Sequence, residues 1–331
     1  MRLLLASTAL LLVLPAIALA QDVTNDLGTI IVTGQTEGYV AVNSVTLIDV
    51  PQSISVVTRE QLDDQAMHSL GDVLRYVPGT TVGQGEGNRD QITLRGQNTT
   101  ADFFLDGVRD DVQYYRGLYN LERVEVLKGP YALIFGRGGG GGIINRVQKT
   151  PSSASAFFGS RVSANSFGAW DLSADLNTPL GDSAAFRLNA VYEELGNHRD
   201  FYEGQRFAVN PYLAADLGGG WRAGLSYEYV DDDRVTDRGV PSLNGRPIED
   251  YRDRFFGVPG VNRTTLEARI LKARLDGDLA PGLSVSTTVL YGDFDKLYDN
   301  VFPSGPATGQ TGTVPLTSYT DPTTRETLQV Q

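Results

Sequence analysis

The chain contains no cysteine, and its 331 residues include only two histidines, His68 and His198. Without cysteine the protein can form no disulfide and offers no thiolate to a metal ion. Two histidines far apart in the sequence do not supply the cluster that a zinc or haem site uses. No enzyme motif takes the place of these missing groups. We therefore expect a protein that is not an enzyme and that holds no resident cofactor.

Long apolar runs are scarce, and the only one lies at the N-terminus. Arg2 precedes an apolar run over residues 3–17, and the small residues of Ala-Leu-Ala follow at 18–20. A basic start, a short apolar core and a small-x-small site are typical of a secretory signal peptide. A buried N-terminal helix is the alternative, but no polar residue breaks the run. We expect residues 1–20 to be a signal peptide that is removed on export.

Positive charge is also in deficit, with a formal net charge of −12. This balance argues against broad nucleic-acid binding, which uses basic surfaces. An anionic ligand would have to be held by local basic residues, because the field of the whole protein repels it. No later segment is apolar enough for a spanning helix, but strands that cross a bilayer escape such a search because their polar and apolar residues alternate.

Residues 36–150 have the pattern of a mixed α/β domain. The run Ser53–Val57 alternates as a strand does, and Thr58 with Gln61 makes a capping box. We expect a short helix there, with Leu62, Ala66 and Met67 on one side.

A second helix is predicted over Ser69–Tyr76, before the sequence Pro78-Gly79 that stops it. Asp106-Gly107 is a hairpin turn signal. Further strands are predicted at Thr80–Val82, Gln91–Arg95, Asp102–Leu105, Arg123–Leu127 and Gly142–Val147.

From about residue 152 the pattern changes to alternating polar and apolar residues in segments of about ten, such as Trp170–Asn177 and Leu283–Tyr291. Short turns such as Leu180–Ser183 alternate with longer polar connections such as Asp231–Asn262. Strands of this length, with short turns at one end and long loops at the other, indicate an outer-membrane β-barrel. A soluble β-sandwich is the alternative, but it would not explain the difference in turn length.

The stretch Leu121–Lys149 is the most informative of the chain. A strand-like run meets a Gly-Pro turn, then five glycines from Gly138 to Gly142, then a second β-branched run. It closely resembles the end of the plug domain of TonB-dependent siderophore receptors of Gram-negative outer membranes. Four further segments are similar to plug motifs and follow in the family's order: Pro51–Thr58, Leu70–Gly79, Ile92–Gly96 and Phe104–Arg109. The segment Val112–Arg116 is similar to the catecholate branch in particular.

The resemblance implies an α+β plug domain with a mixed β-sheet, followed by the first antiparallel strands of a transmembrane β-barrel. The expected organisation is a signal peptide at 1–20, a periplasmic tail at 21–35, the plug at 36–150 and the N-terminal part of the barrel at 151–331. The family's barrel has 22 strands, and we expect seven or eight here, so the barrel would be incomplete. A complete eight-stranded barrel is the alternative, and the mixed pattern of 264–279 argues against it.

The resemblance also places a TonB box in the tail. Thr29, Ile30, Ile31, Val32 and Thr33 form a β-branched run between two glycines. Such a run can pair with the edge of a partner's sheet through main-chain hydrogen bonds. In the family the partner is TonB, energised by ExbB and ExbD. An ordinary first strand of the plug is the alternative.

The glycine run can be written as G-x-G-x-x-G from Gly136 to Gly141, but a dinucleotide site needs a helix after it, and here a strand follows. We interpret it as a loop without Cβ atoms that passes close to other backbone, against the barrel wall. Charged plug residues could form a network with that wall; they are Arg95, Glu122, Glu125, Lys128 and Arg137.

Iron in a siderophore is already saturated by oxygen donors, so the receptor needs cations for the negative charge and aromatic rings for flat groups, not metal ligands. Two plug segments at the outward end supply such residues. The candidate cargo ligands are Glu86, Asn88, Arg89, Gln113, Tyr114, Tyr115 and Arg116. For the two tyrosines, packing between plug and wall is the alternative.

The resemblance thus implies an importer of ferric siderophores in the cell outer membrane, with TonB, the cargo and outer-membrane lipid as partners and no nucleic acid. Two alternatives remain open. The same fold could import another large solute, such as cobalamin or an oligosaccharide. A truncated, non-transporting plug fragment could act only as a binding module.

Overall fold

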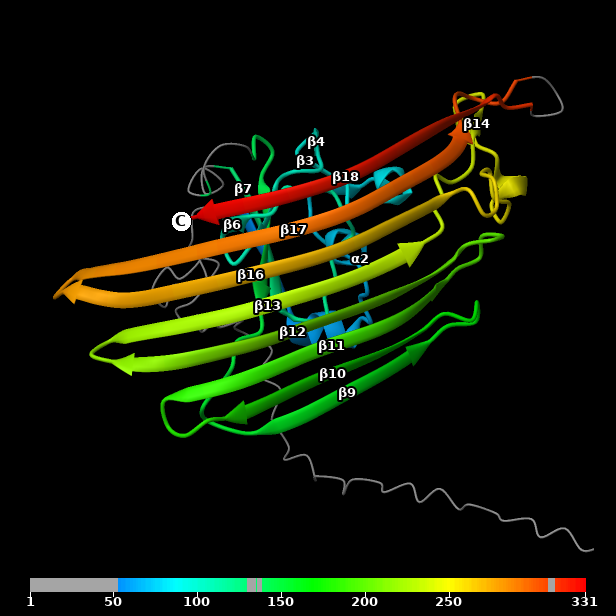
Figure 1. The fold of residues 1–331 in the computed structure, drawn as a ribbon. Coiled ribbons are helices and arrows are strands. Elements are labelled where there is room, and N and C mark those ends of the chain that lie inside the picture. Colours follow the sequence, from blue (N-terminus) through cyan, green and yellow to red (C-terminus); the bar gives the residue numbers. More distant parts are fainter. Residues whose placement is uncertain (1–52, 130–134, 136–138, 309–312) are drawn as a thin grey trace, which may run out of the picture.

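The computed structural model describes residues 53–129, 135, 139–308 and 313–331. Figure 1 shows a long, curved antiparallel sheet with a smaller α+β body packed against one of its faces. The predicted signal peptide at 1–20, the predicted TonB box at 29–33 and part of the glycine run lie outside the described residues. For these segments the predictions stand as made from the sequence.

The smaller body, here called the plug, is built on a five-stranded sheet in the order β1-β7-β8-β5-β6. Strand β5 pairs with β8 in parallel, whereas the other neighbours are antiparallel, so the sheet is mixed as predicted. Its strands are β1 (Ser53–Thr58), β5 (Phe103–Leu105), β6 (Val108–Arg109), β7 (Leu121–Lys128) and β8 (Ile143–Gln148). A second, three-stranded sheet consists of β2 (Thr80–Val82), β3 (Ile92–Leu94) and β4 (Gln97–Thr99).

Two short helices, α1 (Arg59–Asp64) and α2 (Leu70–Leu74), begin where the sequence predicts. The Thr58 hydroxyl accepts from the Gln61 amide at 3.3 Å. Ser69 and Asp72 form a complete capping box. Both helices end earlier than predicted. Ala66 has a left-handed φ of 47°, which is incompatible with helix and ends the run before Met67.

The plug has its own apolar core between the helices and the five-stranded sheet. Leu62, Leu70, Val73 and Leu74 of the helices are buried together with Val124 and Val126 of β7 and Ile144 of β8. Each fully buried aliphatic side chain of this kind contributes about 1.5–3 kcal/mol relative to its exposed state. The core therefore holds the helices on β7, the strand next to the edge strand β1.

The large sheet has eight strands in the order β18-β17-β16-β13-β12-β11-β10-β9, and every strand is antiparallel to its neighbours. It is an open sheet that ends at β9 and β18. Residues 264–279, whose pattern is mixed, do not interrupt it. The strands are β9 (Phe157–Ala164), β10 (Trp170–Pro179), β11 (Ala184–Gly196), β12 (Glu203–Gly218), β13 (Trp221–Arg234), β16 (Arg263–Ala280), β17 (Leu283–Pro303) and β18 (Leu316–Val330).

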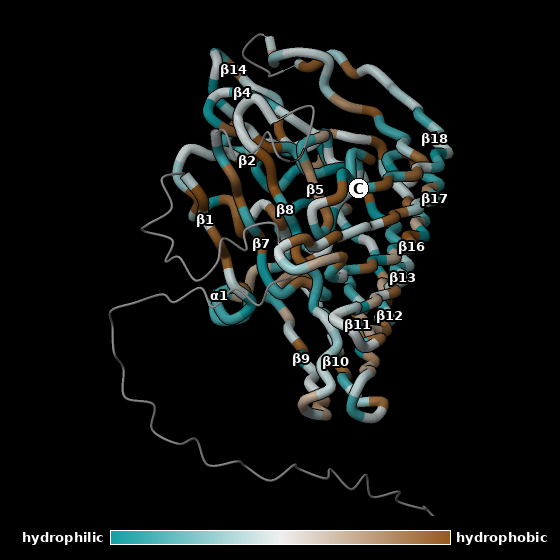
Figure 2. The backbone as a smooth tube through the Cα atoms, turned by 90° about the vertical axis from the view of Figure 1, so that its left-hand side faces the viewer, coloured by the Kyte–Doolittle hydropathy of each residue, from teal (hydrophilic) through white to brown (hydrophobic). Residues whose placement is uncertain are grey.

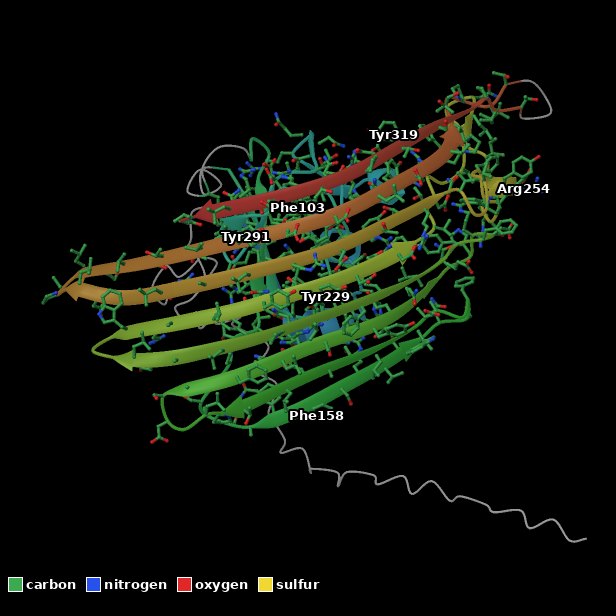
Figure 3. The ribbon with its side chains drawn as sticks, viewed as in Figure 1. Phe103, Phe158, Tyr229, Arg254, Tyr291 and Tyr319 are labelled. Carbon is green, nitrogen blue, oxygen red and sulfur yellow. The ribbon has the colours of Figure 1, made fainter. Side chains whose placement is uncertain are left out.

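The two faces of the large sheet differ in polarity, as the alternation predicts. The outer face exposes apolar and aromatic side chains such as Leu172, Leu225 and Leu275, and Figure 3 shows Phe158 and Tyr291 on it. The inner face, which meets the plug in Figure 2, buries polar residues, among them Asn189 and Lys272. In the part of the chain that the structure describes, no helix is both long and apolar enough to span a bilayer.

The connections at the two ends of the large sheet differ in length. The turn between β10 and β11 covers residues 180–183. The turns between β12 and β13 and between β16 and β17 are shorter and cover residues 219–220 and 281–282. At the other end, residues 235–262 join β13 to β16. We call this segment the outer loop; it contains the hairpin of β14 (Ser242–Leu243) and β15 (Arg246–Pro247) and the short helix η4 (Glu249–Tyr251). The predicted asymmetry of the turns is therefore confirmed.

The described part of the glycine run does pass close to other backbone, but that backbone belongs to the plug. A Cβ on Gly141 would collide with the carbonyl oxygen of Leu94 in β3, and one on Gly142 would lie 2.6 Å from the carbonyl oxygen of Leu127 in β7. The expectation that these glycines lie against the wall of the large sheet is wrong. They seat the loop between the two sheets of the plug.

Candidate functional site

One of the two plug segments that carry the candidate cargo ligands is Gly83–Asp90, which connects β2 to β3 at the apex of the plug. Its short helix η2 (Gly85–Gly87) contains three successive residues with positive φ: Gly85 at 64°, Glu86 at 58° and Gly87 at 77°. A Cβ on Gly87 would lie 2.6 Å from the carbonyl oxygen of Asp237, so the outer loop approaches too closely for any other residue. Glu86 occupies the left-handed region at a cost of about 1 kcal/mol or more.

Three of the predicted cargo ligands lie together at this apex. The Arg89 guanidinium contacts the Glu86 carboxylate at 2.6 Å and also donates to the side-chain oxygen of Gln113. The Gln113 amide nitrogen in turn donates to the Thr100 hydroxyl at 3.0 Å. The Glu86 side chain is 39% exposed and that of Arg89 is 20% exposed, so both can be reached from outside the plug.

Arg116 is placed quite differently, because its side chain is fully buried. All five of its N–H donors are used: they go to the carboxylates of Asp110 and Asp90 and to the carbonyl oxygens of Asp110, Val112 and Tyr114. The guanidinium also lies 4.1 Å from the centre of the Phe103 ring. In this conformation Arg116 therefore has no donor left for a direct hydrogen bond to cargo.

The electrostatics of this buried cluster depend on two aspartates. Burial by itself raises the pKa of Asp110, but Arg116 and Arg146 outweigh it and hold the pKa below its usual value. Arg146 contacts this carboxylate at 2.5 Å and the Tyr114 hydroxyl donates to it at 2.8 Å. Asp90 has the opposite balance, since burial exceeds the attraction of Arg116 and raises its pKa. Asp110 is thus the better compensated of the two charges.

The remaining predicted ligands are held inside the plug or against the sheet. Asn88 is buried. Tyr114 is buried too, and its ring centre lies 5.8 Å from that of Phe294 in β17. The Tyr115 hydroxyl donates to the carbonyl oxygen of Gln84, while Arg234 of β13 lies over its ring. Packing of the tyrosines between plug and wall, the alternative named from the sequence, therefore describes the arrangement found here.

Three residues that sequence reasoning missed reach the apex from the sheet and the outer loop. Arg238 of the outer loop contacts Glu86 at 3.4 Å. From β17, Lys296 donates to the Gln113 carbonyl oxygen at 2.7 Å, and the Tyr298 hydroxyl donates to the Glu86 carbonyl oxygen at 3.0 Å. No local pattern marks them, because they lie more than 150 positions away from their partners.

The plug is fixed firmly to one side of the large sheet. Leu105, Val108 and Val112 pack into an apolar cluster with residues of β11, β12, β13, β16 and β17, most of them from β16 and β17. Lys272 of β16 is buried in contact with Asp106 and Gln148, and Asn120 donates to Glu228 of β13 at 3.1 Å.

These wall contacts differ from the charged network expected from the sequence. Glu125 binds Arg123 at 2.7 Å and Asn145 at 2.9 Å, both within the plug sheet. Lys128 likewise donates within the plug, to the carbonyl oxygen of Pro78. For these two residues the predicted partner was wrong, because both lie on β7, which is an inner strand of the plug sheet between β1 and β8.

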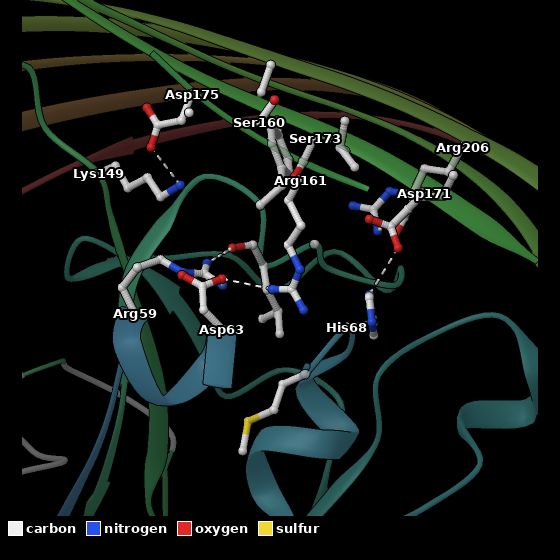
Figure 4. Close-up of a pocket in the computed structure, with 18 residues that line it drawn as sticks. Arg59, Asp63, His68, Lys149, Ser160, Arg161, Asp171, Ser173, Asp175 and Arg206 are labelled. Atoms are coloured by element: carbon white, nitrogen blue, oxygen red, sulfur yellow. Dashed lines mark hydrogen bonds and ion pairs between the residues drawn. The ribbon is translucent and has the colours of Figure 1, made fainter. Parts of the chain in front are cut away.

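Next to β9–β12, the plug and the sheet border an open cavity of about 300 Å³ whose lining is rich in charged residues. Figure 4 shows two ion pairs and one histidine–carboxylate contact that cross or border it. His68 faces Asp171 at 3.6 Å, Arg161 contacts Asp63 of α1 at 2.9 Å, and Lys149 contacts Asp175 at 2.9 Å. Among the described residues, no group of three or more histidines and acids is arranged to hold a metal ion.

Comparison with known proteins identifies the same plug. Residues 46–143 match the family described as the TonB-dependent Receptor Plug Domain. The probable TonB-dependent siderophore receptor PiuA of Acinetobacter baumannii is 28% identical over 293 residues, which are 83% of this chain and 39% of that protein. The probable TonB-dependent receptor BfrD of Bordetella pertussis is 32% identical over 256 residues, 74% of this chain and 34% of that protein. The catecholate siderophore receptor Fiu of Escherichia coli is 32% identical over 224 residues, which are 65% of this chain and 29% of that protein.

Solved structures agree in three dimensions. The crystal structure of PiuA superimposes with a TM-score of 0.79 at 26% identity, covering 86% of this chain and 42% of that one. The open form of Fiu superimposes with a TM-score of 0.76 at 25% identity, covering 87% of this chain and 46% of that one. The chain thus spans between 29% and 39% of the length of these three curated relatives. Through its plug and the antiparallel sheet that carries it, the chain belongs to the family of TonB-dependent receptors and is similar to the siderophore receptors among them.

Proposed function

We propose that the protein is an outer-membrane receptor that imports ferric siderophores, with iron as cargo and no chemical transformation. The observation that carries the proposal is the cationic apex of a plug seated on the polar inner face of a large antiparallel sheet. Arg89, Arg238 and Lys296 converge there from three separate elements. Cations suit an anionic ferric complex, whose metal needs no further ligand.

The relatives' names support this cargo class. Fiu is named a catecholate siderophore receptor and PiuA a probable siderophore receptor. Within the apex, Arg89 and Gln113 would touch the cargo, because they are partly exposed and linked to one another, and Glu86 would lie beside them as the partner of Arg89. Asn88, Tyr114 and Arg116 would hold the two apex loops in place, since their side chains are buried. Tyr115, half-buried, would border the site.

Energy would come from TonB, with ExbB and ExbD, through the predicted box at residues 29–33. That segment precedes β1, and among the described residues β1 is an edge strand of the plug sheet that pairs only with β7. Helix α1 follows β1 directly and lines the polar cavity beside β9–β12. A pull on the chain before β1 would separate β1 from β7 and draw α1 away from the wall, which would enlarge the cavity into a passage.

The location follows from the same parts. Residues 1–20 would direct export, and the apolar outer face of the large sheet would contact outer-membrane lipid.

Binding of purified protein tests the proposed cargo. In detergent, we expect saturable binding of a ferric tris-catecholate complex and no saturable binding of cyanocobalamin, measured by titration calorimetry. Saturable binding of cobalamin, without binding of any ferric complex, would replace the proposal with the alternative cargo.

A further inference from the structure

Glu86 occupies the centre of the cationic apex. Its carboxylate contacts Arg89 of the plug at 2.6 Å and Arg238 of the outer loop at 3.4 Å. Glu86 thus supplies the negative charge that both guanidiniums share, which offsets the repulsion between these two like charges. A carboxylate is also the kind of anionic oxygen group that a guanidinium fork recognises in a ligand.

The cation on the outer loop is held ready by its surroundings. The Arg238 guanidinium lies 3.8 Å from the centre of the Phe302 ring, which orients it by a cation–π contact. Its side chain is 25% exposed, so it is accessible from outside. Next to it, the Gln84 amide donates to the Asp237 carbonyl oxygen at 3.0 Å, which ties the apex loop to the outer loop.

Two further features of the apex carry an energetic cost in this conformation. Glu86 keeps a left-handed backbone at a φ of 58°, a conformation that clusters at ligand sites and switches. In addition, Asn88 Oδ1, Arg89 Nε and Thr236 Oγ1 are buried without a hydrogen-bond partner among the described residues. Buried polar atoms left without partners favour a rearrangement that satisfies them.

We propose that Glu86 is a built-in counter-ion of Arg238 that an anionic cargo displaces. Once Glu86 is displaced, Arg238 binds the anionic group of the cargo in its place, and the receptor thereby selects cargo by charge. The inference rests on the proposed function and adds to it a residue and a rule of selection. Because Glu86 is partly exposed, its ion pairs are weak enough for a multiply charged ligand to replace them. Displacement would remove one tie between the plug apex and the outer loop.

The test compares two ferric complexes of similar size and different charge. Ferric tris-catecholate is triply negative by charge counting, whereas ferric tris-hydroxamate is neutral. For Arg238→Ala we expect the affinity for the anionic complex to fall about 10- to 100-fold, because a charge-assisted hydrogen bond is lost. Affinity for the neutral complex should stay within about twofold.

Matched variants separate charge selection from damage to the loop. Arg246→Ala removes the same charge from an exposed position of the same outer loop and should leave both affinities unchanged. Arg238→Lys keeps the cation and should restore most of the anionic binding. Glu86→Gln removes the counter-ion and should tighten the anionic complex about two- to fivefold, without effect on the neutral one.

The outcomes divide cleanly. An anion-specific loss in Arg238→Ala together with tighter binding in Glu86→Gln would support the inference. Equal loss of both complexes in Arg238→Ala, no loss at all, or weaker anionic binding in Glu86→Gln would overturn it while leaving the proposed function intact. A wild-type protein that binds neither ferric complex would overturn the proposed function, and the inference with it.

Discussion

At the scale of single residues, the buried cluster around Arg116 is organised by the Asp110 carboxylate. It accepts hydrogen bonds from Tyr114, Arg116 and Arg146, at distances between 2.5 and 2.9 Å. Asp90 also contacts Arg116, but its pKa is raised by burial where that of Asp110 is lowered by its arginines. The two aspartates therefore contribute differently to the stability of the plug.

We expect Asp110→Asn to destabilise the plug by about 3 kcal/mol, because it leaves two buried guanidiniums with a neutral partner. Asp90→Asn is the matched control and should cost no more than about 1 kcal/mol, since burial already disfavours its charge. Amide hydrogen exchange in β5 and β8 measures the free energy of local opening. Equal effects of the two substitutions would contradict the assignment.

The effect of Asp110 should also depend on pH. Its pKa in the folded plug lies below the ordinary value of 3.8, so its contribution is fully present above that value and is lost as the pH falls through the folded pKa. Asp90, with a raised pKa, has the opposite sign: its ionisation costs stability as the pH rises through its pKa. Exchange measured from neutral pH down to about pH 3 should show the difference between wild type and Asp110→Asn shrink only at the acid end. A difference that grows there would reject this account.

At this scale the sequence predicts part of the site. Glu86, Arg89 and Gln113 can be chosen because Gly-rich and aromatic loops at an exposed turn offer polar side chains. Arg116 has the same local pattern, yet its guanidinium is enclosed by the carbonyl groups of its own loop. Whether an arginine points outward or inward depends on loop closure, which residue pattern does not determine. Arg238 could not be chosen, because its partner is 152 positions away.

At the scale of elements, period-two alternation predicts the strands of the large sheet well because its two faces meet different environments. Helix ends are predicted poorly, since the left-handed Ala66 has no sequence signal. The glycine run is predicted as a close approach of backbone, but the sequence does not show which backbone it approaches. Leu94 and Leu127 of the plug, not the wall, are the neighbours.

The close approach predicts that Gly141→Ala destabilises the plug. A methyl group there meets the Leu94 carbonyl oxygen, and overpacking of this kind costs about 1–3 kcal/mol. Gly159→Ala in β9, where nothing lies within 4 Å, is the control and should be nearly neutral. The rate of cleavage by a protease under native conditions reports the population of the opened plug. If Gly141→Ala were cleaved by the protease as slowly as wild type, the loop would be able to move aside and the prediction would be wrong.

The edge position of β1 predicts that joining it to β7 blocks transport. Ser55 and Val126 are directly opposite each other, and none of these 331 residues is a cysteine, so Ser55→Cys with Val126→Cys gives one defined disulfide within this part of the protein. We expect the oxidised protein to bind ferric siderophore but not to transport it, and a reductant to restore uptake. The single variant Ser55→Cys is the control. Transport at the wild-type rate by the oxidised double variant would exclude separation of β1 from β7.

At the scale of the whole molecule, the plug is held unequally by the sheet. Apolar packing and buried charges fix it to β13–β17, whereas next to β9–β12 a cavity crossed by ion pairs lies between plug and sheet. The sequence predicts both domains and their order, because each has its own pattern. Their docking depends on pairs such as Lys272 with Asp106, which join residues far apart in the chain. The boundaries proposed at residues 20, 35 and 150 remain predictions.

Uptake of iron by living cells tests the central claim most directly. Cells that lack their own siderophore receptors would express the complete gene for this protein, either as wild type or with Ile31→Pro, and would be supplied with radioactive iron as ferric tris-catecholate. Proline removes a main-chain donor from the predicted TonB box. We predict that wild type restores uptake, and that Ile31→Pro abolishes uptake while binding at the cell surface persists. No uptake by wild type, or undiminished uptake by Ile31→Pro, would contradict TonB-driven import of ferric siderophores by this protein.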